Sequence, residues 1–231
     1  MSASIICIRP QPGLAATISA GRSMGLEIVG EPLFAIRSVP WTAPDPATVD
    51  ALLIGSANVF RHGGPQLERL RGIPVHAVGS TTAELAAEAG FAVERIGSGG
   101  LQSLMQAEGS TSDSGRRYLR LSGAERVALD VPAGSVIEER IVYEAVPLAI
   151  SPGFERRLRA GGIVLLHSAA AARHFAGECN RLCIPREALS LAALGPRITD
   201  GLAAGWRAVR HANVPTDAAL LALAGDMCQD R

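Results

Sequence analysis

The chain has 231 residues, 48% of them hydrophobic, which is enough to bury one large core or two small ones. Its formal net charge is zero, so no general electric field draws it to nucleic acid or to a membrane surface. All 22 basic residues are arginine, which excludes a Schiff-base lysine and a Walker-type phosphate lysine. Any anionic ligand must therefore be held by arginine, hydroxyl and backbone N–H groups.

The sequence also argues against several other classes. No apolar run approaches the roughly 20 residues of a membrane helix, and the start MSASIICIRP lacks the features of a signal peptide. The four cysteines show no paired spacing beyond Cys179 and Cys183, which favours reduced thiols. The five histidines show no metal-ligand spacing. We therefore expect a cytoplasmic protein without metal or cofactor, and without a nucleic-acid or membrane partner.

Taken in chain order, the sequence alternates short apolar strands with helices. We predict a strand over 4–8, a helix over 13–24 closed by Gly25, and a strand over 27–29. Further strands are predicted at 52–54, 75–78, 93–96, 118–121, 140–143, 163–166, 191–194 and 208–210. Short apolar strands joined by helices indicate parallel, doubly wound sheets.

Two parts of the chain repeat each other at a spacing of about 112 to 116 residues. In the first half LLIGSANVF (52–60) precedes AVGSTTAELAAEAGF (77–91). In the second half VLLHSAAAARHF (164–175) precedes ALGPRITDGLAAGW (193–206). Each copy predicts a strand ending in Ser-Ala and a helix, then a strand ending in Gly and another helix. Two such units facing one another would form a cleft lined by backbone N–H groups and hydroxyls.

Two Pro-bounded stretches suggest where domains are joined. Residues 32–40 and 146–152 both read as extended segments with little helix signal. If both cross between domains, residues 38–143 form a domain inserted into a discontinuous one made of 1–34 and 149–231. The predicted fold is α/β, with two similar doubly wound parallel-sheet domains joined by a two-segment linker.

The turns that follow the repeated strands are candidate anion sites. Strands ending at Ser56, Gly79, Ser168 and Gly195 would place the unpaired N–H groups and positive dipole ends of several helices at one crevice. After Gly79, which permits close backbone approach, the hydroxyls of residues 80–82 lie at or near the helix cap. Each hydroxyl can equally well cap its own helix, and the sequence leaves this alternative open.

The order and spacing of these motifs resemble the uroporphyrinogen-III synthase family, over nearly the whole chain. The resemblance rests on Arg9-Pro10, Ser56-Ala57-Asn58, the AVGSTTAELAAEAGF segment, Tyr143 in VYEAVPL, Ser168, and Gly195-Pro196. It implies an enzyme that acts on hydroxymethylbilane, a flexible linear tetrapyrrole with many carboxylates. The reaction expels a hydroxyl, inverts the terminal ring and closes the macrocycle. The resemblance also implies a monomer that needs no cofactor.

The same resemblance suggests roles for individual residues. It implies substrate contacts at Arg9, Ser56, Ala57, Gly79, Ser80, Thr81, Ser168, Ala169, Gly195, Pro196 and Thr199. Thr82 and Tyr143 are the candidate catalytic residues. Thr82 matches the threonine of the family in the motif after Gly79, and the phenol of Tyr143 could protonate the departing oxygen of the substrate. The alternative for Tyr143 is an ordinary strand tyrosine with a solvated hydroxyl.

The chain departs from the family pattern at several positions. Ile8 stands before Arg-Pro, and Gly55 and His167 precede the two Ser-Ala turns, where threonine is usual. Ile198 replaces the threonine expected three residues after the second glycine, with Thr199 next to it. Either that helix starts one residue later or the hydroxyl contact is lost. The competing functional class is a non-catalytic two-domain binder of an anionic small molecule.

Adjacent residues on a strand point to opposite faces, so His167 and Ser168 are not expected to form a hydrolase pair. Arg116, Arg117 and Arg120 form a short basic group, which we predict to be a solvated edge.

Overall fold

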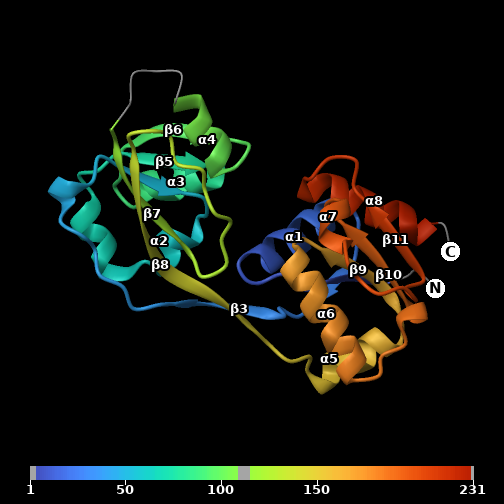
Figure 1. Ribbon diagram of the computed structural model, residues 1–231. Coiled ribbons are helices and arrows are strands. Elements are labelled where there is room, and N and C mark those ends of the chain that lie inside the picture. The colour runs from blue at the N-terminus through green and yellow to red at the C-terminus, as the bar shows by residue number, and fades with distance from the viewer. Residues whose placement is uncertain (1–3, 109–114, 230–231) are drawn as a thin grey trace. The chain divides into compact units, whose positions relative to one another are not determined.

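The computed structural model describes residues 4–108 and 115–229 (Figure 1). The chain separates into two compact units. Unit 1 combines the residues up to Ala35 with those from Val146 onward, and unit 2 spans Ile36–Ala145. The chain passes between the units twice, so unit 1 is discontinuous in sequence and unit 2 is continuous.

Unit 1 is built on a five-stranded sheet in which every pair of neighbouring strands is parallel. Its strands are β1 (Ile5–Cys7), β2 (Ile28–Gly30), β9 (Gly162–Leu166), β10 (Leu189–Ala193) and β11 (Ala208–His211). Their order in space is β11-β10-β9-β1-β2. Numbered along the chain within this unit, the order is 2-1-3-4-5, a common doubly wound arrangement whose switch point lies between β1 and β9.

Helices cover both faces of this sheet (Figure 1). On one face α1 (Gly13–Ser23) and α8 (Asp217–Gln229) bury apolar side chains, and on the other α5 (Pro152–Arg159) and α6 (Ala169–Arg181) do so. The alternation along β1 fits this arrangement, because Cys7 joins the first cluster and Ile6 the second. The short segments η3 (Arg186–Ala188) and α7 (Pro196–Thr199) complete the unit.

Unit 2 has a six-stranded sheet in the order β3-β8-β7-β4-β5-β6. The strands are β3 (Phe34–Ser38), β4 (Ala51–Ile54), β5 (Val75–Val78), β6 (Val93–Gly97), β7 (Arg117–Gly123) and β8 (Val136–Pro147). The pairs among β4, β5, β6, β7 and β8 are parallel. In space β8-β7-β4-β5-β6 repeats the arrangement β2-β1-β9-β10-β11 of unit 1, but the chain enters it at a different strand. The two units are therefore circular permutations of one sheet plan.

The two faces of this second sheet are covered unequally. One face packs against α2 (Asn58–His62), η2 (Gly64–Leu70), α3 (Ser80–Glu88) and their connections. The short η1 (Pro46–Thr48) has no buried residue. On the other face the described cluster is small and contains one helix, α4 (Leu101–Glu108). Leu129, from the connection between β7 and β8, packs beside α4. That connection, residues 124–135, contains no helix.

The predicted fold class is confirmed, and nine of the predicted strands match the structure to within two residues at each end. The strand predicted at 140–143 is the middle of β8, which is much longer. The helix predicted after Gly195 is a single turn, because Asp200 leaves the helical region with ψ 130° and Gly201 follows with φ +77°.

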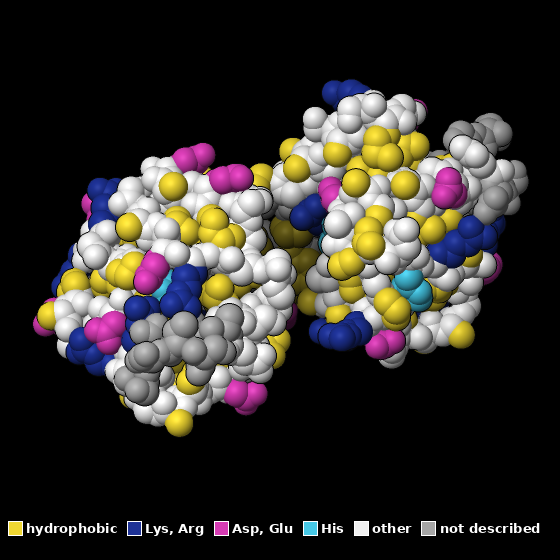
Figure 2. Space-filling model, turned by 90° about the horizontal axis from the view of Figure 1, so that it is seen from above, with side chains coloured by type: hydrophobic (Ala, Val, Ile, Leu, Met, Phe, Trp, Pro, Cys, Tyr) yellow, Lys and Arg dark blue, Asp and Glu magenta, His cyan; other side chains and the backbone are white. Residues whose placement is uncertain are grey.

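The chain surface carries charges of both signs. Acidic and basic side chains are interspersed on the face shown in Figure 2, as expected for a chain without net charge. In the part of the chain that the structure describes, no helix is long and apolar enough to cross a membrane.

Candidate functional site

In unit 2, several predicted site residues lie in one row at the carboxyl edge of the sheet. The register of β4 with β5 and β7, continued two residues past the strand ends, places Ser56 beside Gly79 on one side and Gly123 on the other. Gly123 pairs with Tyr143 of β8. Neighbouring strands lie about 4.8 Å apart, so the row from Tyr143 to Gly79 spans roughly 15 Å. This edge is long enough for a ligand of several rings.

Unit 1 has an equivalent row. The same continuation of the register places Ser168 beside Gly195 and beside Pro10, with Arg9 next to His167. These residues follow β1, β9 and β10 and so flank the switch point of the sheet. Open α/β sheets bind ligands at the carboxyl ends of their strands, near the switch point. The sequence-predicted residues of each unit therefore meet at the edge where such sheets bind ligands.

The turn after β5 leaves its helix open. Gly79 has φ +84°, a conformation that favours glycine, and α3 begins at the next residue without a side-chain cap. Ser80 and Thr81 are exposed, whereas Thr82 is 5% exposed. Among the described residues nothing hydrogen-bonds to the Thr82 hydroxyl. The first N–H groups of α3 and this hydroxyl therefore remain available to an anion.

The two Ser-Ala turns behave differently from the turn at Gly79. The Ser168 hydroxyl oxygen accepts a hydrogen bond from Ala171 N–H at 3.2 Å, and that of Ser56 accepts one from Asn58 N–H at 3.3 Å. Ala57 caps α2, and Ala169 is the first residue of α6. Ser168 thus caps α6, whereas Ser56 stands one residue before the N-cap of α2 and accepts from the first N–H of that helix. The O–H of each serine can still donate to a ligand.

The turn after β10 decides between the two alternatives for Ile198, a helix that starts one residue later or a lost hydroxyl contact. The helix starts directly after the glycine, as it does after Gly79, so it is not shifted by one residue. Ile198 occupies the position of Thr82 and packs against the core of unit 1. Thr199 donates to the Pro196 carbonyl oxygen at 3.1 Å and contacts His211 Nε2 at 2.8 Å. The hydroxyl beside Ile198 is therefore engaged in local bonds.

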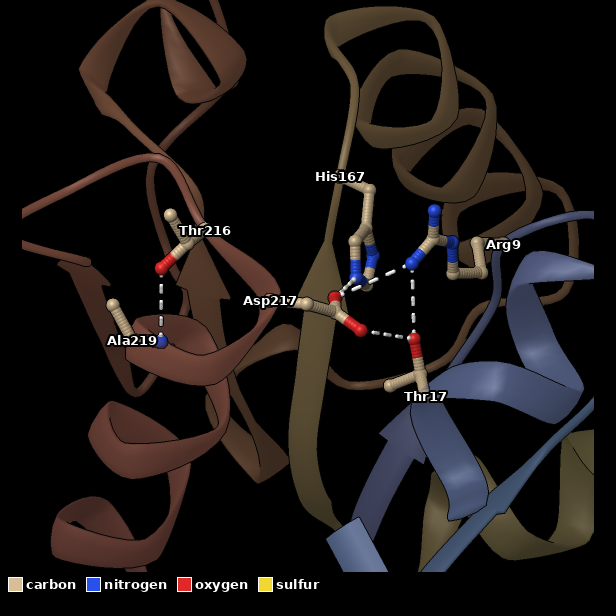
Figure 3. A network of polar contacts seen from close by, with 6 residues as sticks. All are labelled: Arg9, Thr17, His167, Thr216, Asp217 and Ala219. Carbon is tan, nitrogen blue, oxygen red and sulfur yellow. Dashed lines mark hydrogen bonds and ion pairs between the residues drawn. The ribbon is translucent and has the colours of Figure 1, made fainter. Parts of the chain in front are cut away.

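Arg9 belongs to a polar network that sequence reasoning missed (Figure 3). Its Nη1 donates to Thr17 Oγ1 at 3.0 Å and to Asp217 Oδ1 at 3.3 Å. The Thr17 hydroxyl donates to Asp217 Oδ2 at 2.8 Å, and His167 Nε2 lies 2.7 Å from Asp217 Oδ1. Hydrogen bonds from His167 and Thr17, with the charge of Arg9, lower the pKa of Asp217 despite its partial burial.

The network fixes the guanidinium of Arg9 through one nitrogen. Within the described residues its Nε and Nη2 donate to no other side chain, which leaves one edge of the guanidinium available to a carboxylate. Asp217 lies 208 residues away along the chain. The only feature of the sequence that indicated such a contact is the predicted domain that combines residues 1–34 with residues 149–231.

Tyr143 is half-buried, and its ring packs over Gly123. A Cβ at residue 123 would lie 2.6 Å from the ring, so a side chain there would displace the ring from this position. The ring centroid of His62 is 6.3 Å away, and burial, with the charge of Arg61, lowers the pKa of that histidine. In the described part of the chain no group hydrogen-bonds to the Tyr143 hydroxyl. The phenol is therefore held in place by packing, and its proton is uncommitted.

One prediction for the basic group on β7 is wrong. Arg120 is not at a solvated edge but is 5% exposed, and its Nη1 donates to Val127 O and to Glu139 Oε1, both at 2.8 Å. It lies on the sheet face that residues 124–135 cover. Arg117 does lie at the surface, where it pairs with Asp50 at 2.8 Å.

The fold and the two rows define a protein of two parallel doubly wound α/β units with candidate binding groups at the strand ends. The model of the family "Uroporphyrinogen-III synthase HemD" matches residues 15–222, and the chain belongs to this family. Membership of the family supports an enzymatic role in porphyrin biosynthesis.

Solved structures agree with this assignment at the level of the fold. The uroporphyrinogen-III synthetase of Helicobacter pylori is 16% identical with a TM-score of 0.66, and the alignment covers 97% of this chain and 99% of that one. A mutant uroporphyrinogen III synthase of Thermus thermophilus is 16% identical with a TM-score of 0.52, over 99% and 100% of the two chains. No curated protein matches significantly in sequence.

Proposed function

We propose that the chain is a uroporphyrinogen-III synthase that cyclises hydroxymethylbilane, with inversion of the terminal ring and loss of water. It would act as a lyase without a cofactor. The observation that carries the proposal is the row at the carboxyl edge of unit 2. There the phenol of Tyr143, which has no hydrogen-bond partner among the described residues, lies on the same edge as the uncapped start of α3.

The substrate carboxylates are bound by groups that have unused donors. These are the N–H groups at the start of α3, Nε and Nη2 of Arg9, and the O–H groups of Ser56 and Ser168. The wider proposed contact set is Arg9, Ser56, Ala57, Gly79, Ser80, Thr81, Ser168, Ala169, Gly195, Pro196 and Thr199. Within this set Thr199 contributes least, because its hydroxyl is already bonded locally.

Tyr143 would protonate the departing hydroxyl, directly or through water. Thr82 would hold the substrate by its unpaired hydroxyl. Closure of the bilane also occurs spontaneously, because the pyrroles are reactive. The main task of the protein is therefore to hold the chain in the geometry that leads to the inverted isomer. Loss of one side chain should slow turnover without abolishing it.

A product assay tests the proposal. Purified protein is supplied with freshly generated hydroxymethylbilane, the product is oxidised, and the type III and type I uroporphyrins are separated by chromatography. Activity raises the ratio of type III to type I above that of a heat-inactivated sample. Binding of the bilane without a change in this ratio would instead support the non-catalytic binder. Light scattering at the assay concentration tests whether the active form is a monomer.

A further inference from the structure

The connection between β7 and β8 leaves a cleft on one face of the sheet in unit 2. Parallel neighbours need a crossover connection, usually a helix, and α1 has this role between β1 and β2. Residues 124–135 form the crossover between β7 and β8, and they contain no helix. A cleft of about 400 Å³ lies at this connection. Long irregular connections in compact domains are often functional.

The cleft combines an apolar wall with an excess of positive charge. Its lining includes the aliphatic side chains of Leu129, Val131 and Ile137. The charged lining groups are Arg120, Arg126 and Glu139. The oxygens of Glu139 accept from Arg120 Nη1 at 2.8 Å and from Arg126 Nε at 2.7 Å. Two guanidinium groups face one carboxylate, so the lining retains one positive charge.

Arg120 has donors that the protein leaves unused. Its Nη1 makes both of its hydrogen bonds, to Val127 O and to Glu139, whereas its Nε is fully buried without an acceptor. Nη2 also donates to no group among the described residues. Nη2 is not among the fully buried atoms. It is therefore the Arg120 donor that a ligand in the cleft can reach, and a hydrogen bond from a guanidinium to a carboxylate is a strong one.

The fold itself does not require an arginine at this position. Leu53 pairs with Arg120, and its counterpart in the repeat, Leu165, pairs with Cys7. Cys7 therefore occupies the same place in the sheet plan of unit 1, where it packs in the apolar cluster beneath α1. A small apolar side chain satisfies the sheet there. In unit 2 the Nη1 of Arg120 ties the irregular connection to the sheet through Val127 O, and this bond does not use Nη2.

We propose that this cleft binds a small molecule with one carboxylate and a compact apolar body. The carboxylate accepts a hydrogen bond from Nη2 of Arg120, and the apolar body packs against Leu129, Val131 and Ile137. The volume lies within the range of about 300 to 1,000 Å³ typical of small-molecule sites. The site goes beyond the proposed synthase reaction, because it uses none of the strand-end residues of the two rows.

Calorimetric titration of the full-length protein with 3-phenylpropionate tests the site, with 3-phenylpropan-1-ol as the neutral analogue. We expect saturable binding of the acid and binding of the alcohol that is weaker by about tenfold or more. Val131→Trp fills the cleft and Arg120→Met removes the carboxylate donor, and each should weaken binding of the acid by a similar factor. Val127→Trp is the matched control, because this 80% exposed residue of the same connection does not line the cleft.

A second measurement identifies the source of the carboxylate. If it is an arm of the tetrapyrrole, Val131→Trp raises KM for hydroxymethylbilane and Val127→Trp does not. If it is a separate small molecule, both variants keep the wild-type KM while only Val131→Trp loses 3-phenylpropionate binding. The proposal is overturned if the wild type shows no saturable binding up to about 10 mM, or if Val131→Trp binds as well as the wild type. Because the titration needs no turnover, it remains informative if the synthase assay fails.

Discussion

The two units share one sheet plan, but they differ in the connection that follows the strand beside the switch point, β1 in unit 1 and β7 in unit 2. In unit 1, α1 joins β1 to β2 and packs Leu14 into the core with 4% exposure. In unit 2, residues 124–135 join β7 to β8 as an irregular segment, and Leu129 is only partly buried. A helix fills the space above the strand, whereas the irregular segment leaves a cleft above Arg120. The same sheet thus supports either dense packing or a binding cavity.

The strand-end turns show a second difference. The serine turns are similar in both units, since each serine accepts a hydrogen bond from an N–H in the first turn of the helix that follows it. The glycine turns differ, because α3 is a nine-residue helix with an unpaired threonine hydroxyl and α7 is a single turn with Ile198 in its place. The two copies therefore agree at their serine turns and differ at their glycine turns.

The largest expected effect tests the packing difference between the two connections. Leu14→Ala should lower the free energy of unfolding of unit 1 by about 2 to 5 kcal/mol, as expected for a fully packed leucine. Leu129→Ala should cost roughly half as much in unit 2, because fewer contacts are lost. Urea unfolding followed by tryptophan fluorescence measures both.

Each unit contains one of the two tryptophans, so the two losses can be read separately. Trp206 stacks on Phe175 in unit 1, and Trp41 donates to Gly63 O in unit 2. A Trp41→Phe background reports on unit 1 and a Trp206→Phe background on unit 2. Equal losses for the two leucine variants would contradict the difference in packing.

The next effect concerns the row at the carboxyl edge of unit 2. Tyr143→Phe should lower kcat for type III formation by about tenfold to a hundredfold, because the variant loses its proton donor. KM and the urea midpoint should change little, since the hydroxyl makes no hydrogen bond in the described structure. Tyr118→Phe is the matched control, because the other tyrosine is buried beneath α4 and away from the row. An unchanged kcat in Tyr143→Phe would remove the tyrosine from the mechanism.

A smaller effect concerns the pH dependence of stability. It comes from α6, the helix after the Ser-Ala turn of unit 1, which is longer than its counterpart α2 in unit 2. Glu178 of α6 accepts from Arg181 at 2.7 Å and from Ile150 N–H at 2.8 Å. Hydrogen bonding from Arg181, aided by that from Ile150, outweighs burial and lowers the pKa of Glu178 to about 2. Since the folded pKa is lower than the unfolded one, the stabilisation is complete above about pH 5 and disappears as the pH falls towards 2.

Glu178→Gln isolates this contribution. The variant should be less stable than the wild type by on the order of 2 kcal/mol at pH 7, and the difference should shrink as the pH is lowered. Urea unfolding at a series of pH values measures it. Glu88→Gln, on the exposed side of α3, is the matched control and should show no such trend. A difference that stays constant down to pH 2 would assign the loss to packing instead of charge.

Much of this molecule follows from local sequence patterns. Strands such as 75–78 are recognisable because they are short apolar runs between turn residues, and the strand ends at Ser56 and Gly79 are visible in the repeat. Contacts between distant parts of the chain leave no such pattern. The pairing of Arg9 with Asp217 is one example. The burial of Arg120 is another, because it depends on an irregular connection whose path no periodicity predicts.

The smallest expected effect compares the two glycine turns directly. Thr82→Val removes a hydroxyl that has no partner in the described structure, and we expect kcat/KM for hydroxymethylbilane to fall by roughly threefold to tenfold, as for the loss of one hydrogen bond. Thr199→Val should change it by less than about twofold, because that hydroxyl already bonds to Pro196 and His211. Both substitutions keep the size of the side chain, so each variant is the control of the other. Equal effects would mean that the two turns contribute alike to substrate binding, despite Ile198 in the second.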